Sequence, residues 1–239
     1  MMKILALDTT EATASAALTD GDRLIGQFTL SSGNTHSETL LPMIDALLSA
    51  AKMTVGDVDM IAAAIGPGSF TGLRIGAATA KGLALPFGTL CVGVSSVAAL
   101  AENAYPTDAL VCPVINARRG QFFTGLFDFA DGNRVQLIGD CMMMKDEIIA
   151  DAEKRGRSVI FVGSGADEFA SAVSTAVKPC GIGAYESAYS VAKLAYAKYS
   201  AASEDERKSF TAAALNPVYL RKAQAERELE ERLAAEKRS

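Results

Sequence analysis

Short, continuously apolar runs bounded by turn residues predict β-strands in the first 104 residues of the chain. Five such runs lie at residues 3–7, 13–18, 23–30, 60–65 and 90–94. Stretches with helical periodicity lie between or after the later runs, at residues 35–51, 71–85 and 96–103. Three strands in succession, followed by alternating helices and strands, predict a mixed sheet with helices on its faces.

The first predicted helix has two alternative descriptions. Thr35 and Glu38 have the spacing of a capping box, which favours an early start. Pro42 opposes an early start, because proline is tolerated only in the first turn of a helix. We therefore expect this helix either to begin near Thr39 or to kink at Pro42.

A second set of strands follows a Pro-containing turn and repeats the three-strand theme. Its strands are predicted at residues 110–115, 121–127, 134–138 and 158–162, and its helices at 166–177 and 187–200. The repetition predicts two similar lobes, a larger one at residues 1–104 and a smaller one at 105–220. Residues 221–239 carry six basic and five acidic side chains and are predicted to form a charged, frayed helical tail.

Composition narrows the chemistry that this chain can perform. One histidine, His36, excludes a metal site that needs two or three histidines from this chain. The four cysteines have no close spacing, and Cys91 and Cys112 lie in apolar runs, so we expect core thiols. No run is long and apolar enough to span a bilayer and no signal-peptide pattern is present, so we expect a soluble, cytoplasmic protein. The net charge of −5 argues against strong binding of bare nucleic acid.

Two turns that follow buried strands are candidates for binding a nucleotide or another anion. The turn at residues 8–10 could offer N–H groups and hydroxyls to a phosphate, and the glycine loop at 66–72 opens a helix. Each has a plainer alternative, a turn held by its own hydrogen bonds or a rigid strand-to-helix connection. The candidate anion-binding residues are Asp8, Thr9, Thr10, Gly66, Gly68 and Ser69.

The helix after the glycine loop has small residues at every fourth position, namely Gly72, Gly76, Ala80 and Ala84. Glycine inside a helix costs about 1 kcal/mol relative to alanine, so this face indicates close packing against another element. The packing partner is either the preceding helix of the same lobe or a helix of another protein.

Three further features carry weaker signals. The Gly-Ser-Gly turn at residues 163–165 could line a nucleotide's base and ribose, although a single GxG is unspecific. His36 lies at a helix start, where a solvated or capping histidine is the expected role. Arg118 and Arg119 lie on a hairpin, where exposed positive charges are usually only solvated.

Five segments of the chain resemble the TsaB (YeaZ) family, an accessory subunit of the bacterial machinery that makes threonylcarbamoyladenosine in tRNA. They are ILALDTT at 4–10, HSE at 36–38 with LP at 41–42, the run at 66–76 ending in LRIG, NARR at 116–119 and PVYLR at 217–221. The family usually has aspartate where this chain has Asn116. The resemblance covers residues 2–221, and the run at 66–76 is its most specific part.

This resemblance implies a two-lobed α/β fold of the actin/sugar-kinase/Hsp70-like (ribonuclease-H-like) kind and a non-catalytic role. The implied partner is TsaD, a homologous catalytic subunit that binds metal through two histidines. This chain would bind and activate TsaD in threonylcarbamoylation of the adenosine next to the anticodon of tRNA. A TsaE-like ATPase would join the pair, and tRNA would be reached only through the complex. No cofactor is expected to be required, and the subunit junction is a candidate site for ATP or ADP.

The resemblance also implies a four-helix interface between the first-lobe helices of the two proteins. The residues expected to form it here are Leu40, Ile44, Leu47, Gly72, Ile75, Gly76 and Ala80. Two other functions stay open. One is an active ATPase or phosphotransferase of the same fold that uses Asp8, and the other is a homodimer that uses the same helix face when the chain is alone.

Overall fold

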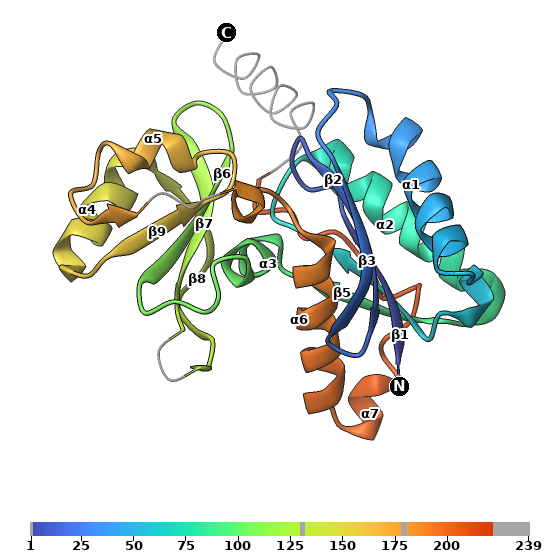
Figure 1. Cartoon of the computed structure of the whole chain (residues 1–239). Coiled ribbons are helices and arrows are strands. Elements are labelled where there is room, and N and C mark those ends of the chain that lie inside the picture. The colour runs from blue at the N-terminus through green and yellow to red at the C-terminus, as the bar shows by residue number, and fades with distance from the viewer. Residues whose placement is uncertain (1, 130–131, 178–180, 222–239) are drawn as a thin grey trace, which may run out of the picture.

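A computed structural model of the chain describes residues 2–129, 132–177 and 181–221 and shows two lobes side by side (Figure 1). Each lobe contains a five-stranded mixed sheet. The strands of the first sheet lie in the order β3 (Arg23–Leu30), β2 (Ala14–Asp20), β1 (Lys3–Asp8), β4 (Met60–Ala64) and β5 (Leu90–Val94). Those of the second lie in the order β10 (Ala176–Val177), β9 (Val159–Val162), β6 (Leu110–Asn116), β7 (Gln121–Asp128) and β8 (Val135–Met144).

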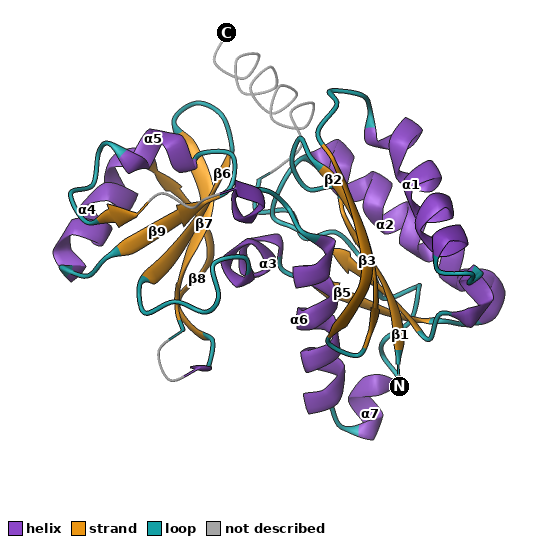
Figure 2. Cartoon of the chain, viewed as in Figure 1, coloured by secondary structure: helices purple, strands orange, loops and turns teal. Residues whose placement is uncertain are grey.

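Helices cover both faces of each sheet (Figure 2). The helices are α1 (His36–Ala50), α2 (Phe70–Ala84), α3 (Ser96–Glu102), α4 (Lys145–Arg155), α5 (Ala166–Ala170), α6 (Ala188–Ala201) and α7 (Glu204–Arg207). In the first lobe, α1 and α2 lie on one face of the sheet and α6 on the other. In the second lobe, α3 lies on one face, and α4 and α5 lie on the other. The predicted mixed α/β fold with two lobes is therefore confirmed.

β1 is the central strand of the first sheet, antiparallel to β2 and parallel to β4. Every residue of β1 after Lys3 is buried, because helices lie on both faces of the sheet. A strand of this kind is a continuous apolar run instead of an alternating one, which is the pattern that the sequence shows. Asp8, at its carboxyl end, is consequently buried as well.

The chain returns to its first lobe after completing the second. Helix α6 follows the second sheet in sequence but packs against β1, β2 and β4. Farther along, the backbone N–H of Cys91 donates to the carbonyl of Phe210, and that of Val218 to the carbonyl of Ile65. Residues 188–220, which the sequence analysis assigned to the smaller lobe, thus pack mainly against the first sheet.

One apolar core lies between the two sheets and holds residues from both lobes. It includes Val97 of α3 and Val191 of α6, together with strand residues such as Ala62 and Phe127. Two separate cores fill the outer faces, one beneath α1 and α2 and one beneath α4 and α5. Because the central core is continuous, the lobes pack as one body.

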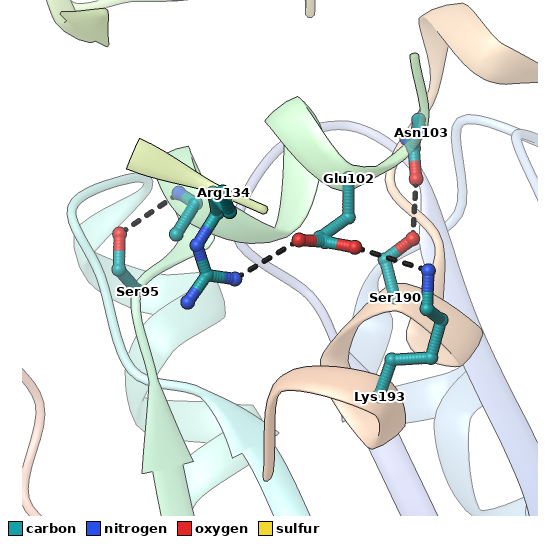
Figure 3. Close-up of polar contacts among 7 residues, drawn as sticks. Ser95, Glu102, Asn103, Arg134, Ser190 and Lys193 are labelled. Carbon is teal, nitrogen blue, oxygen red and sulfur yellow. Dashed lines mark hydrogen bonds and ion pairs between the residues drawn. The ribbon is translucent and has the colours of Figure 1, made fainter. Parts of the chain in front are cut away.

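Polar contacts surround the place where α3 passes α6 (Figure 3). One carboxylate oxygen of Glu102 accepts from Arg134 and the other from Lys193, each at 3.0 Å. The hydroxyl of Ser190 donates to the side-chain carbonyl of Asn103 at 2.6 Å. Glu102 therefore connects the loop before β8 with a helix that lies on the other lobe's sheet.

The structure corrects several element boundaries. The expected start near Thr39 is wrong, because α1 begins at His36 and contains Pro42 on its exposed side. Only one helical hydrogen bond is lost there, the one that would go to the carbonyl of Glu38. The helix expected at 166–177 ends at Ala170, since the following segment forms the edge strand β10. The charged tail at 222–239 lies outside the described residues.

Two elements were not predicted in full. β8 extends to Met144, well beyond the expected end at Ile138. Helix α4 was missed, although it has acidic residues in its first turn, basic residues in its last and Gly156 as its C-cap. Over the residues that the structure describes, no helix is both long and apolar enough to cross a membrane.

Replacing Glu102 by glutamine tests the polar contacts at the α3–α6 crossing. Glu102→Gln removes the charge that Arg134 and Lys193 share, so we expect the free energy of unfolding to fall by about 1–2 kcal/mol. Urea denaturation followed by circular dichroism measures the change. Glu153→Gln, on the exposed side of α4, is the matched control and should have little effect. Equal effects of the two substitutions on the free energy of unfolding would contradict a stabilising role for the contacts of Glu102 with Arg134 and Lys193.

Candidate functional site

A cavity of about 600 Å³ lies between the two lobes. The turn after β1 and the start of α2 form its first-lobe side, and the end of β6 and Ser164 form the other. The segment that ends the described chain completes it. Its polar and aromatic lining includes Thr10, Glu11, Ser69, Phe70, Thr71, Asn116, Arg118, Ser164, Tyr219 and Arg221. A cavity of this size is within the range of small-molecule sites.

Hydrogen bonds within the chain occupy the turn at residues 8–10. One carboxylate oxygen of Asp8 accepts from the backbone N–H of Thr10 at 3.0 Å and from its hydroxyl at 2.7 Å. The hydroxyl of Thr9 donates to the carbonyl of Gly72 at 2.8 Å. Burial, with the charge of Glu186 second, raises the pKa of Asp8 to about 7. The turn is thus held by its own contacts and by α2.

The glycines at the start of α2 lie directly against this turn. A β-carbon on Gly72 would lie 1.9 Å from the carbonyl oxygen of Thr9, and one on Gly68 would lie 2.5 Å from that of Thr10. The N–H of Ser69 donates to the same Thr10 carbonyl at 2.7 Å. Glycine is therefore needed at positions 68 and 72 because two stretches of backbone touch there. This is the rigid strand-to-helix connection, the plainer alternative to an anion-binding loop.

The predicted anion-binding residues divide into two groups. Thr10, Gly68 and Ser69 line the interlobe cavity, whereas Asp8, Thr9 and Gly66 do not. A metal-bound nucleotide held by this turn would need its N–H groups, hydroxyls and carboxylate to face the ligand. The hydroxyls of Thr9 and Thr10, the N–H of Thr10 and one oxygen of Asp8 are bonded within the chain, and the other oxygen of Asp8 is buried with no hydrogen-bond partner in the described structure. Because only this buried oxygen is left over, the turn does not fit that group. A nucleotide at the subunit junction stays a prediction.

The helix residues expected at a partner interface point into this chain's own core. Leu40, Ile44, Leu47 and Ala80 are at most 4% exposed, and a β-carbon on Gly76 would lie 2.6 Å from the hydroxyl oxygen of Thr9. Ile75 is half-buried. The four-residue spacing correctly predicts that this face of α2 is closely packed. It does not show that the face packs against this chain's own core, so an interface through α1 and α2 must use other residues.

The outward faces of the same helices carry small and apolar residues. Leu41 is 52% exposed, and Leu85 and Phe87, just after α2, are 76% and 58% exposed. The small residues Ala46 of α1, and Ala78 and Gly82 of α2, are exposed on the same two helices. We call these six residues the α1–α2 surface.

The segment at 217–221 packs against the glycine loop. Only the family resemblance, and no residue pattern, singled out this segment in the sequence. The N–H of Val218 donates to the carbonyl of Ile65 at 2.7 Å, and its carbonyl oxygen lies 2.4 Å from where a β-carbon of Gly66 would be. The rings of Phe70 and Tyr219 are 4.8 Å apart. No periodicity marks this segment, so residue patterns alone could not have placed it.

Glu11 and Glu186 were not singled out from the sequence, yet they lie at the junction of the lobes. Glu11 accepts from the N–H of Ser164 at 3.3 Å and also from its hydroxyl. Burial and the neighbouring Glu11 raise the pKa of Glu186 to about 10. The ring of His36 lies 2.7 Å from the carbonyl oxygen of Glu11, so the histidine supports this turn.

Cysteines and metal ligands add little chemistry. Cys91 and Cys112 are buried, as expected of core thiols, and burial raises the pKa of Cys112 to about 12. Cys141 is partly buried, and Cys180 lies outside the described residues. Across residues 2–129, 132–177 and 181–221, no group of three or more His, Cys, Asp or Glu side chains is placed to hold a metal.

The fold belongs to the actin/sugar-kinase-like class. It has two lobes with mixed sheets, a helix that returns from the second lobe to the first, and a cleft between the lobes. The family model described as "TsaD: tRNA N6-adenosine threonylcarbamoyltransferase" matches residues 30–235. The tRNA threonylcarbamoyladenosine biosynthesis protein TsaB of Bacillus subtilis is 36% identical over 162 residues, 68% of this chain and 71% of that protein. The TsaB protein of Escherichia coli is 35% identical over 124 residues, 51% of this chain and 53% of its own.

A solved structure, YeaZ from Pseudomonas aeruginosa, superimposes with a TM-score of 0.76 at 25% identity and covers 92% of this chain and 100% of its own. The chain belongs to the TsaB (YeaZ) family.

A pair of glycine substitutions within α2 tests the contact with the turn after β1. Gly72→Ala places a β-carbon against the Thr9 carbonyl, so we expect it to lower the free energy of unfolding by about 2 kcal/mol or more. Gly82→Ala is the matched control in the same helix, because its β-carbon would enter open space. That substitution should stabilise the protein by about 0.5–1 kcal/mol. Similar effects of the two on urea denaturation would contradict the contact.

Glu186→Gln tests the buried carboxyl group through the pH dependence of stability. The folded chain keeps a proton on Glu186 that the unfolded chain loses above a pKa of 4.5, so stability falls as pH rises toward about 10. Between about pH 8, where Asp8 with its pKa of about 7 is largely ionised, and about pH 10, the wild type should lose more stability than Glu186→Gln. Denaturation curves across this window measure it, with Glu153→Gln as control. Parallel curves for all three proteins would contradict the prediction.

Proposed function

We propose that this chain is a non-catalytic subunit that binds and activates a TsaD-like catalytic paralogue in threonylcarbamoylation of the adenosine next to the anticodon of tRNA. The observation that carries the proposal is the α1–α2 surface. Leu41, Leu85 and Phe87 are exposed on or just after two neighbouring helices that also expose small residues, in a family whose members are named for this pathway. Large exposed apolar patches mark protein interaction sites.

The small residues at the centre of this surface explain what kind of partner it fits. Ala46, Ala78 and Gly82 are exposed and small, so they would let the backbone of an opposing helix approach closely. A partner of the same fold would present the equivalent pair of helices, which gives a four-helix contact. The match of this chain to the TsaD family model over residues 30–235 supports a homologous partner.

The chemistry within this chain supports an accessory role. A metal site with two histidines cannot be formed by a chain that has only His36, and the ring of that residue contacts the Glu11 carbonyl. The alternative of an active ATPase or phosphotransferase needs a carboxylate that faces substrate. Asp8 does not supply one, because it is 1% exposed and its accepting oxygen holds Thr10.

The remaining partners follow from the same proposal. A TsaE-like ATPase joins the pair, tRNA is bound by the complex, and the complex works in the cytoplasm. Alone, the chain uses the α1–α2 surface to form a homodimer, so that homodimer and heterodimer compete for one surface. Light scattering with and without the TsaD-like partner distinguishes the two assemblies.

A charged, bulky residue at the centre of the α1–α2 surface should prevent the complex. Ala78→Arg places a long side chain where a helix would pack, so we expect loss of co-purification with the TsaD-like partner and of tRNA modification. Ala150→Arg is the matched control, because Ala150 is exposed on α4 of the other lobe. Circular dichroism checks that both variants fold. Co-purification of Ala78→Arg at the wild-type ratio would show that the surface is wrong.

A further inference from the structure

Two arginines that are far apart in the sequence, Arg118 and Arg221, line the interlobe cavity, and Arg74 and Arg119 lie next to residues that line it. We call Arg74, Arg118, Arg119 and Arg221 the arginine cluster. Arg118 and Arg221 line the cavity together with Tyr219, and the guanidinium of Arg221 donates to the carbonyl of Ala117. Arg74 donates to the hydroxyl of Tyr219 at 3.1 Å. The four arginines are therefore linked to one another through direct contacts or through adjacent positions in the chain. The protein as a whole has a net charge of −5.

The backbone holds two of these arginines in an unusual conformation. Arg118 and Arg119 have φ values of +66° and +57°, which cost free energy for residues with a β-carbon. The side-chain oxygen of Asn116 accepts from the N–H of Arg118 at 2.8 Å and supports the turn. Both side chains are exposed, and neither forms an ion pair with an acidic side chain among the residues that the structure describes. Strain of this kind is concentrated at functional sites.

An aromatic surface lies beside the arginine cluster. The rings of Phe70 and Tyr219 are 4.8 Å apart, and the guanidinium carbon of Arg74 lies 3.9 Å from the centre of the Phe70 ring. Tyr219 is still 41% exposed, so its ring retains surface for another planar group. Arginines bind phosphates through two parallel hydrogen bonds, and aromatic rings stack on unpaired bases.

We propose that the arginine cluster and Tyr219 form a docking surface for RNA on this subunit. The guanidinium groups contact backbone phosphates, and Tyr219 stacks on an unpaired base. This inference rests on the proposed function for the identity of the RNA, a tRNA, but it goes beyond that function by assigning a direct contact to this chain. It also revises the expectation from net charge, because contact is decided by local charge and not by the total.

The arrangement favours RNA over other anionic partners. An acidic protein segment would use the arginines but would not need an exposed ring packed at a tilt against a second one. A metal-bound mononucleotide would need the turn at residues 8–10, whose hydroxyl groups and one carboxylate oxygen are bonded within the chain and whose other carboxylate oxygen is buried. Arginines spread along the mouth of a cavity suit a ligand that carries several phosphates.

Binding of a fluorescently labelled, unmodified tRNA transcript tests the proposal, with the full chain alone and in complex with its TsaD-like partner. Arg118→Glu with Arg119→Glu should weaken binding about tenfold or more and reduce the slope of log affinity against log salt by about 1–2. The control, Lys52→Glu with Lys154→Glu, makes the same change in net charge at exposed positions away from the cavity and should change affinity by less than about threefold.

Tyr219 variants separate stacking from charge. Tyr219→Ala should weaken binding about tenfold without changing the salt slope, and Tyr219→Phe, which keeps the ring, should retain most of the affinity. Equal weakening by the cluster and control variants, or tRNA binding unchanged in the cluster variant, would overturn the proposal. Binding of a labelled acidic peptide that is lost in the cluster variant, with tRNA binding unchanged in that variant, would assign the surface to a protein instead.

Different variants test the RNA-docking surface and the partner-binding surface, so either can be wrong without the other. The cluster variant should still co-purify with the TsaD-like partner at the wild-type ratio, whereas Ala78→Arg should lose the partner and still bind tRNA as an isolated chain. Loss of tRNA binding by both variants would contradict the assignment to the arginine cluster. Loss of the partner by both would contradict the α1–α2 surface.

Discussion

The contact between the start of α2 and the turn after β1 is the constraint on which the rest of the first lobe depends. Backbone meets backbone there, with a β-carbon on Gly72 excluded by the Thr9 carbonyl and the Ser69 N–H bonded to Thr10. This contact fixes the small-residue face of α2 inward. The hydroxyl of Thr9 donates to Gly72 within this contact, and the N–H of Thr10 donates to Asp8 within the turn. The same contact therefore determines which face of α2 is exposed and which polar groups of the turn are bonded within the chain.

This packing supports the proposal that the chain binds its partners through exposed surfaces. With its small residues used inward, α2 exposes Ala78 and Gly82 beside Leu85, next to the exposed side of α1. The polar lining of the cavity between the lobes includes Thr10, Ser69, Asn116, Ser164 and Arg118, whereas the buried Asp8 does not line it. Arg74 of the arginine cluster and Ala78 of the α1–α2 surface lie one turn apart on α2, so the two proposed surfaces adjoin on this helix.

Much of the fold could be predicted from the sequence, because burial on both faces leaves a clear pattern. The apolar runs that became β1, β4 and β5 and the glycine loop before α2 were placed correctly. The errors have local causes. Pro42 pointed to a later start of α1, but one missing hydrogen bond on an exposed face is tolerated. The segment after Ala170 forms a strand edge because β9 offers pairing partners that a local pattern does not show.

The candidate site was less predictable, because it depends on contacts between distant segments. Spacing identified Gly72 and Gly76 as packed positions, but it could not show that Thr9 was the neighbour. Arg118 and Arg119 looked solvated in sequence, and only the fold brings Tyr219 and Arg221 beside that hairpin.

Reconstitution of tRNA threonylcarbamoylation with a TsaD-like and a TsaE-like protein, with and without this chain, tests the central claim most directly. The account predicts that modified tRNA forms at an appreciable rate only when this chain is present. It also predicts that this chain alone forms none. An equal rate of modification in its absence would contradict the claim that it activates the catalytic subunit.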